Sequence, residues 1–202
     1  MGKRQFRTRG RGFSRRKVGQ RELIHRFLIV CEGEKSEPTY FRSFRVPSLV
    51  MDIHGLGANT LGLVKAAVDL STLHAYDQVW CVFDRDSFPP ENFNSALSLA
   101  RSRGFQVAYS NEAFELWYLL HFEYCDAALS RQTYSQRLSG YLGYRYEKNS
   151  ERVVAEILPY SATAIRNASR LLATYEPTSP VRDNPSTTIH LLVQELQKYE
   201  QR

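Results

Sequence analysis

Four short, nearly continuous apolar runs alternate with helix-like segments in the first 110 residues of this chain. The runs cover residues 27–31, 49–53, 78–83 and 105–109. Apolar runs of this length are typical of strands buried on both faces, and such strands occur in parallel sheets whose crossovers are helices. The alternation therefore predicts an α/β fold with a Rossmann-like parallel sheet of about four strands flanked by helices.

Helical patterns fill the intervals between these runs and continue after the last one. They cover residues 36–44, 60–73, 90–103, 113–122, 150–158, 162–175 and 185–199. The residues expected to cap helix N-termini are Ser36, Asn111 and either Ser186 or Thr187. No strong strand signal follows residue 124. We therefore expect an α/β core at residues 23–123 and a helical C-terminal part, residues 124–202, packed on it.

Positive charge is concentrated at the N-terminus. The whole chain has a net charge of +6, but residues 1–21 hold nine Lys and Arg residues and no acid, so the rest is mildly acidic. With four glycines and no apolar periodicity, residues 1–22 are expected to form a disordered basic arm. Arginines that neutralise phosphates, with Phe6 and Phe13 stacking on bases, would bind nucleic acid, either RNA or DNA. A solvated tail that raises solubility is the alternative.

Several classes of protein are excluded by what the sequence lacks. No apolar run approaches the roughly 20 residues that span a bilayer, and no apolar segment of a signal peptide follows the basic N-terminus. Three cysteines, Cys31, Cys81 and Cys125, are too few and too scattered for a disulfide scaffold. We therefore expect a cytoplasmic protein that does not bind membranes.

Acidic residues follow the predicted strands. Glu32 follows the first strand, Asp84 and Asp86 follow the third, and Glu115 comes soon after the fourth. Because the carboxyl ends of parallel strands meet at one edge of a sheet, these acids should converge there. Each acid alone could be a loop residue or a helix cap, but converging carboxylates repel one another unless a hard cation such as Mg²⁺ lies between them. The lack of a paired His/Cys set argues against zinc.

Two motifs carry a resemblance to known proteins. The pattern FLIVCEGE, followed about fifty residues later by VWCVFDRDS, resembles the Toprim catalytic domain shared by type IA topoisomerases, bacterial primases and OLD-family nucleases. More specifically, the stretches EGEKSEPTYF, FDRDSF, SNEAFELWYLLHF and NPSTTIHLLVQEL resemble the RloB family over residues 23 to about 198. This resemblance implies a Toprim-type sheet, Mg²⁺-dependent phosphodiester cleavage by a nuclease, and an ATPase partner subunit in phage-defence or restriction loci, where abortive infection is the expected outcome.

Carried over residue by residue, the resemblance assigns the catalytic and metal-binding roles. Glu32 matches the Toprim glutamate, and Asp84 and Asp86 match the metal-binding aspartates. One or two Mg²⁺ ions, for which Mn²⁺ can substitute, would bind there. The acids that match a second metal site are Glu115 first, with Glu34 and Glu37 behind it. The candidate substrate contacts are Lys35, Arg85, Asn111 and His121, although His121 could equally be a half-buried helix histidine.

Two other functions remain open at this point. A non-catalytic nucleic-acid-binding or regulatory subunit could retain the Toprim fold, and a phosphatase could use Asp84 and Asp86 as nucleophile and acid. The C-terminal part mixes tyrosines with arginines, among them Arg131, Arg137 and Arg145. Such a mixture could bind single-stranded nucleic acid or pack at an interface.

Overall fold

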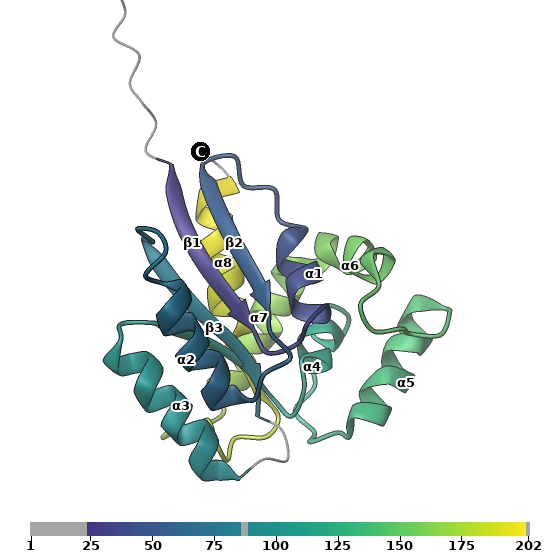
Figure 1. The fold of residues 1–202 in the computed structure, drawn as a ribbon. Coiled ribbons are helices and arrows are strands. Elements are labelled where there is room, and N and C mark those ends of the chain that lie inside the picture. Colours follow the sequence, from purple (N-terminus) through teal and green to yellow (C-terminus); the bar gives the residue numbers. More distant parts are fainter. Residues whose placement is uncertain (1–23, 86–88, 201–202) are drawn as a thin grey trace, which may run out of the picture.

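The computed structural model describes residues 24–85 and 89–200 (Figure 1). The expectations for the basic arm and for Asp86 concern residues outside these ranges, so they stay predictions. No helix in the two described ranges is long and apolar enough to cross a bilayer. All three cysteines are buried and unpaired, as expected for a chain without a disulfide scaffold.

A five-stranded sheet in the order β2-β1-β3-β4-β5 forms the centre of the fold. Its strands are β1 (His25–Cys31), β2 (Leu49–Gly55), β3 (Gln78–Asp84), β4 (Gln106–Asn111) and β5 (Ser186–Thr187). The first four are parallel, so the predicted α/β class with a parallel sheet is confirmed. The chain leaves β1 toward β2 and then returns past β1 to β3. The strand order therefore reverses between β1 and β3, which is where open α/β sheets bind their ligands.

The fifth strand differs from the prediction. The sequence predicts one helix over residues 185–199 with Ser186 or Thr187 as its cap, but Ser186–Thr187 instead pairs antiparallel with β4. Helix α8 begins only at Ile189 and ends at Glu200. The reason is a long-range hydrogen bond: the Thr188 hydroxyl accepts the Tyr109 N–H at 2.9 Å, which holds the segment against the edge of β4.

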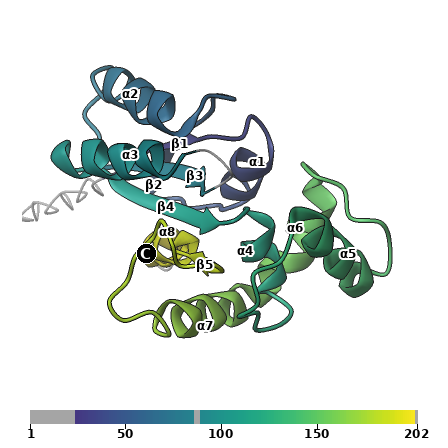
Figure 2. The ribbon, with the colours of Figure 1, turned by 90° about the horizontal axis from the view of Figure 1, so that it is seen from below.

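Helices cover both faces of the sheet (Figure 2). On one face, α2 (Thr60–Leu70) and α3 (Pro90–Ser102) pack against Leu28 and Val30 of β1. On the other face, Phe27, Ile29 and Cys31 belong to a core shared with α1 (Ser36–Arg42), α4 (Glu115–Leu119) and α8. Alternate β1 residues therefore enter different cores, which explains why the run is apolar throughout.

Besides β5 and α8, the C-terminal part contains three α-helices and one short 3-10 helix. They are α5 (Arg131–Leu142), α6 (Glu151–Ile157), η1 (Leu158–Tyr160) and α7 (Ser161–Leu172). Helix α6 contacts α1, while α5 and α7 contact α4. The sequence does not predict α5, because only Tyr134 and Leu138 of this helix are buried and its apolar stripe is weak.

The central strand provides a test of the packing. Ile29 is fully buried in the middle of β1. We expect Ile29→Ala to lower the free energy of unfolding by about 2–5 kcal/mol, and Ile29→Val, which leaves a smaller cavity, by about 0.5–1.5 kcal/mol. Urea unfolding followed by circular dichroism measures both. Equal midpoints for Ile29→Ala and the unchanged protein would contradict this position for β1.

Candidate functional site

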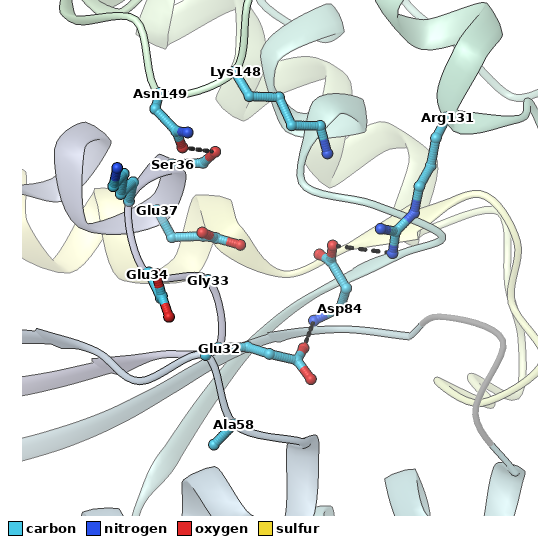
Figure 3. A pocket seen from close by; sticks show the side chains of 12 residues that line it. Glu32, Gly33, Glu34, Ser36, Glu37, Ala58, Asp84, Arg131, Lys148 and Asn149 are labelled. Atoms are coloured by element: carbon cyan, nitrogen blue, oxygen red, sulfur yellow. Dashed lines mark hydrogen bonds and ion pairs between the residues drawn. The ribbon is translucent and has the colours of Figure 1, made fainter.

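A pocket of about 540 Å³ lies at the carboxyl ends of β1 and β3, where the strand order reverses (Figure 3). Four acids and three cations are among the residues that line it. The lining residues are Glu32, Gly33, Glu34, Lys35, Ser36, Glu37, Gly57, Ala58, Asp84, Arg131, Lys148 and Asn149. The pocket is therefore polar and charged, unlike the apolar clefts that bind most drug-sized molecules.

Glu32 joins the two central strands at the bottom of this pocket. Its Oε2 accepts a hydrogen bond from the backbone N–H of Asp84 at 2.9 Å. Its Oε1 accepts one from the hydroxyl of Thr60, the first residue of α2, at 3.2 Å. The structure thus brings Glu32 and Asp84 into contact across 52 positions of sequence, as expected for acids at neighbouring strand ends.

Two further acids are buried beside this pair. Glu37, in the first turn of α1, is 6% exposed, and its Oε2 has no hydrogen-bond partner among the described residues. Glu115, the first residue of α4, is 4% exposed. A Cβ atom at Gly33 would lie 2.1 Å from the Glu37 Oε2 atom, so only glycine allows the loop after β1 to pass this close to the carboxylate.

The four carboxylates are close enough to repel one another. Burial raises the pKa of Asp84 well above its ordinary value; Glu37, Glu115 and Glu32 raise it further, against the opposing charge of Arg131. Burial also raises the pKa of Glu37, and Glu115 and Glu32 add to that rise. Negative charge in this pocket is therefore only partly compensated by the cations around it.

Two cations and an amide reach the pocket from the C-terminal part. Arg131, the first residue of α5, lies 3.6 Å from the Asp84 carboxylate, and the Lys148 Nζ atom lies 2.8 Å from the Glu115 Oε1 atom. Asn149 accepts a 2.7 Å hydrogen bond from the Ser36 hydroxyl. The sequence predicts only that Arg131 belongs to a part rich in tyrosine and arginine, and it does not indicate Lys148 or Asn149 as site residues. One local feature of the sequence could have indicated where α5 begins. Ser130 is a good N-cap residue, and its side chain caps α5, so that Arg131 is the first residue of the helix.

Ser36 itself does not cap α1, although the sequence predicts that it does. The N-cap position is Lys35, and it makes no side-chain capping bond. Ser36 is already inside the helix, so its hydroxyl is free to bond Asn149 instead. Lys35 and Glu34 both lie exposed at the pocket. The Glu34 side chain lies against Gly57, where a Cβ atom would be 2.7 Å from the Glu34 Oε1 atom.

The other predicted substrate contacts lie outside the pocket lining. Arg85 donates its backbone N–H to the Ser110 carbonyl at 2.7 Å. Asn111 is buried and donates its side-chain amide to the Asp183 carbonyl at 2.8 Å, so it does not cap the next helix, whose N-cap is Phe114. The amide is used to hold the loop before β5 against β4.

His121 lies buried in an aromatic part of the core. Its Nδ1 atom donates to the Trp117 carbonyl at 2.9 Å, and its ring lies edge-on to those of Trp117 and Tyr40. Burial lowers its pKa to about 4. This histidine is therefore neutral at physiological pH. It is 1% exposed, so it is more deeply buried than the half-buried helix histidine that the sequence suggested as an alternative to a substrate contact.

The donor chemistry of the pocket fits a hard divalent cation. Mg²⁺ takes oxygen ligands, and Glu37 offers a buried carboxylate oxygen without a hydrogen-bond partner among residues 24–85 and 89–200. Within those same residues, no group of three or more His, Cys, Asp or Glu side chains is placed as a ready-made metal site. Arg131 and Lys148 lie beside Asp84 and Glu115, and the further acid expected here, Asp86, is outside the described ranges.

Comparison with known proteins identifies a family. A family model described as RloB-like protein matches residues 27–196, a span that contains the whole pocket lining and all helices from α1 to α7. Comparison with curated proteins and with solved structures gives no match.

Replacing the crowded acids by neutral amides should stabilise the metal-free protein. Because folding raises the pKa of Asp84 and of Glu37, the folded chain holds these protons more tightly than the unfolded chain. The stability from these groups is therefore present below about pH 4 and is lost as the pH rises through the raised values. We expect Asp84→Asn and Glu37→Gln each to raise the melting temperature at pH 7 by about 2–4 °C, with a smaller gain at pH 4.

Differential scanning fluorimetry in EDTA at both pH values measures this effect. The controls are Asp126→Asn and Glu147→Gln, which remove exposed carboxylates that do not line the pocket. These should change the melting temperature by no more than about 1–2 °C at either pH. Pocket variants that melt at or below the unchanged protein at pH 7 would show that the acids do not repel one another.

Proposed function

This chain belongs to the family of RloB-like proteins, and from that premise we propose that it is a phosphodiester-cleaving nuclease dependent on Mg²⁺ or Mn²⁺. The observation that carries the proposal is the contact of Glu32 with Asp84 where the strand order reverses, with Glu37 and Glu115 buried beside it. From the family resemblance we also propose that it acts with an ATPase partner subunit in defence against phage.

The crowding of acids supports an enzyme more than a binding module. Mutual repulsion of buried carboxylates costs stability, and a protein that only binds nucleic acid gains nothing from it. Such costs are typical of active sites, where activity requires an arrangement that folding alone would avoid. The competing function, a non-catalytic nucleic-acid-binding module, is favoured by one observation: Asp84 and Glu115 already have Arg131 and Lys148 as ion partners.

The residues of the pocket suit hydrolysis of a phosphodiester. Glu32 and Asp84, with Asp86 and the acids around them, would hold one or two divalent cations. Such cations lower the pKa of water and stabilise charge on a phosphate. Glu32 is fixed in orientation by the Asp84 N–H and the Thr60 hydroxyl. In the reaction a water oxygen would bond to phosphorus and one phosphorus–oxygen ester bond would break. The water proton would pass to Glu32 or to solvent, and the leaving ester oxygen would take up a proton from solvent to form a hydroxyl group. Lys35, exposed at the pocket, would neutralise charge on the phosphate.

Cleavage of nucleic acid tests this proposal directly. We expect RNA or DNA in a panel of labelled substrates to be cut in Mg²⁺ or Mn²⁺ and to stay intact in EDTA. If the chain alone shows no cleavage, the ATPase partner is added. Asp84→Asn and Glu32→Gln should reduce the rate by at least about 100-fold, since each removes a charged ligand. Asp126→Asn, outside the pocket, should retain the full rate.

Two results would count against the enzyme. If the unchanged protein cuts nothing even with its partner, or if Asp84→Asn cuts at the full rate, the acids serve another purpose. A crystal soaked in Mn²⁺ is an independent check: anomalous density between Glu32 and Asp84 is expected before any substrate is known.

Removing the basic arm should weaken nucleic-acid binding. Residues 1–21 carry nine positive charges and no acid, and each phosphate contact adds about one unit to the slope of log affinity against log salt concentration. A chain beginning at residue 22 should bind an oligonucleotide more weakly and with a slope reduced by several units. Fluorescence anisotropy at a series of salt concentrations measures both, and an unchanged slope would exclude the arm from the contact.

A further inference from the structure

The pocket is layered, with acids beneath and cations above. The side chains of Arg131 and Lys148 are 44% and 52% exposed, whereas those of their partners Asp84 and Glu115 are 17% and 5% exposed. Figure 3 shows Arg131 and Lys148 reaching into the pocket from the side opposite Glu32 and Ala58. A molecule entering from solvent beside α5 therefore meets Arg131 and Lys148 before the buried acids Glu37 and Glu115.

We propose that Arg131 and Lys148 form a phosphate-binding site at the rim of the pocket, where they receive a phosphate of the nucleic-acid substrate. This inference rests on the proposed function for the chemistry at the acids. It adds a substrate contact that the C-terminal part supplies, and it names phosphate oxygen as the group recognised.

Charge explains why such a rim is needed. Glu32, Glu37 and Asp84 attract a metal ion but repel a phosphodiester anion, so the acids alone would disfavour substrate binding. A guanidinium and an ammonium group above them reduce the negative charge that the substrate meets. The guanidinium also presents a planar fork of N–H groups that matches two phosphate oxygens.

Contacts besides the two ion pairs hold the rim in place. Ser130 caps α5 and thereby positions Arg131, and α5 packs on α4. The loop that carries Lys148 is anchored by the buried ring of Tyr146, whose backbone N–H donates to the Ser139 hydroxyl at 2.8 Å. Next to Lys148, Asn149 is bonded to Ser36 of α1. Arg131 and Lys148 therefore stay in position for a phosphate even when their ion pairs with Asp84 and Glu115 are broken.

Solvent exposure leaves both cations able to bind a second anion. Arg131 lies 3.6 Å from Asp84, a loose pairing that contributes little to stability, and both cations keep about half of their surface in solvent. Lys148 is held more closely, because its Nζ atom lies 2.8 Å from the buried Glu115 carboxylate. A divalent cation bound by the acids would replace the positive charge that Arg131 and Lys148 supply, and both would then be available to a phosphate.

Matched substitutions test the site in the full-length chain. Arg131→Gln and Lys148→Gln remove the proposed contacts. Arg137→Gln, on the same helix but paired with Glu123 at 3.0 Å, and Lys198→Gln, paired with Glu195 on α8, are the controls. A labelled single-stranded oligonucleotide is titrated by fluorescence anisotropy at several salt concentrations, in EDTA and again in Ca²⁺. Mn²⁺ affinity is measured separately by calorimetry.

We expect each rim substitution to weaken oligonucleotide binding by about 10-fold and to reduce the salt slope by about one unit. Mn²⁺ should bind as tightly as before or more tightly, because the acids lose a competing cation. Arg131→Lys and Lys148→Arg, which keep the charge, should retain the salt slope. The two control substitutions should change neither binding constant.

Two outcomes would overturn the proposal. Unchanged oligonucleotide binding and slope in both buffers would show that no phosphate contacts the rim. A parallel loss of Mn²⁺ affinity would show that Arg131 and Lys148 merely hold the acids in place. Failure of the proposed function looks different: wild-type protein would bind no Mn²⁺ and cut nothing, while the effect of the rim substitutions on oligonucleotide binding in EDTA would still be measurable.

Discussion

The carboxylate of Glu32 is the interaction on which the arrangement of the pocket depends. One of its oxygens accepts the backbone N–H of Asp84, and the other accepts the hydroxyl of Thr60 at the start of α2. A single side chain thus links β1, β3 and a helix at the point where the strand order reverses. The other charged groups of the site, among them Glu37, Arg131 and Lys148, are positioned by the helices and the loop that carry them.

Charge separation by depth follows from the fold. Asp84, Glu37 and Glu115 come from a strand end and from helix starts that pack in the core, and burial with the neighbouring carboxylates raises the pKa of Asp84 and of Glu37. The cations come from α5 and the loop after it, which lie at the edge of the core and leave their side chains half exposed. Arg131 and Lys148 pair with Asp84 and Glu115, whereas the Glu37 Oε2 atom has no hydrogen-bond partner among the described residues.

Apolar runs and helical patterns in the sequence predicted most of the strands and helices of the fold. The apolar runs predicted all four parallel strands, including the edge strand β2, which is only partly buried, and the residues that follow two of the runs, Glu32 and Asp84, do meet. Contacts made by segments without an apolar or helical pattern could not be predicted in this way. Strand β5 is two hydrophilic residues whose extended form depends on β4, and Lys148 reaches Glu115 from a loop 33 positions later with no periodic signal. The weak apolar stripe of α5 is the reason why the sequence does not predict this helix, which positions Arg131.

The pairing of β5 with β4 also affects how the chain is made. Thr187 bonds Ser110 from 77 positions farther along, and α8, which follows, contacts the same strand. A nascent chain that has just completed β4 therefore exposes an open strand edge until the ribosome has added these residues. Unpaired strand edges recruit other chains and start aggregation. Slow translation between the two strands would prolong that exposure, so the interval is where a chaperone would help most.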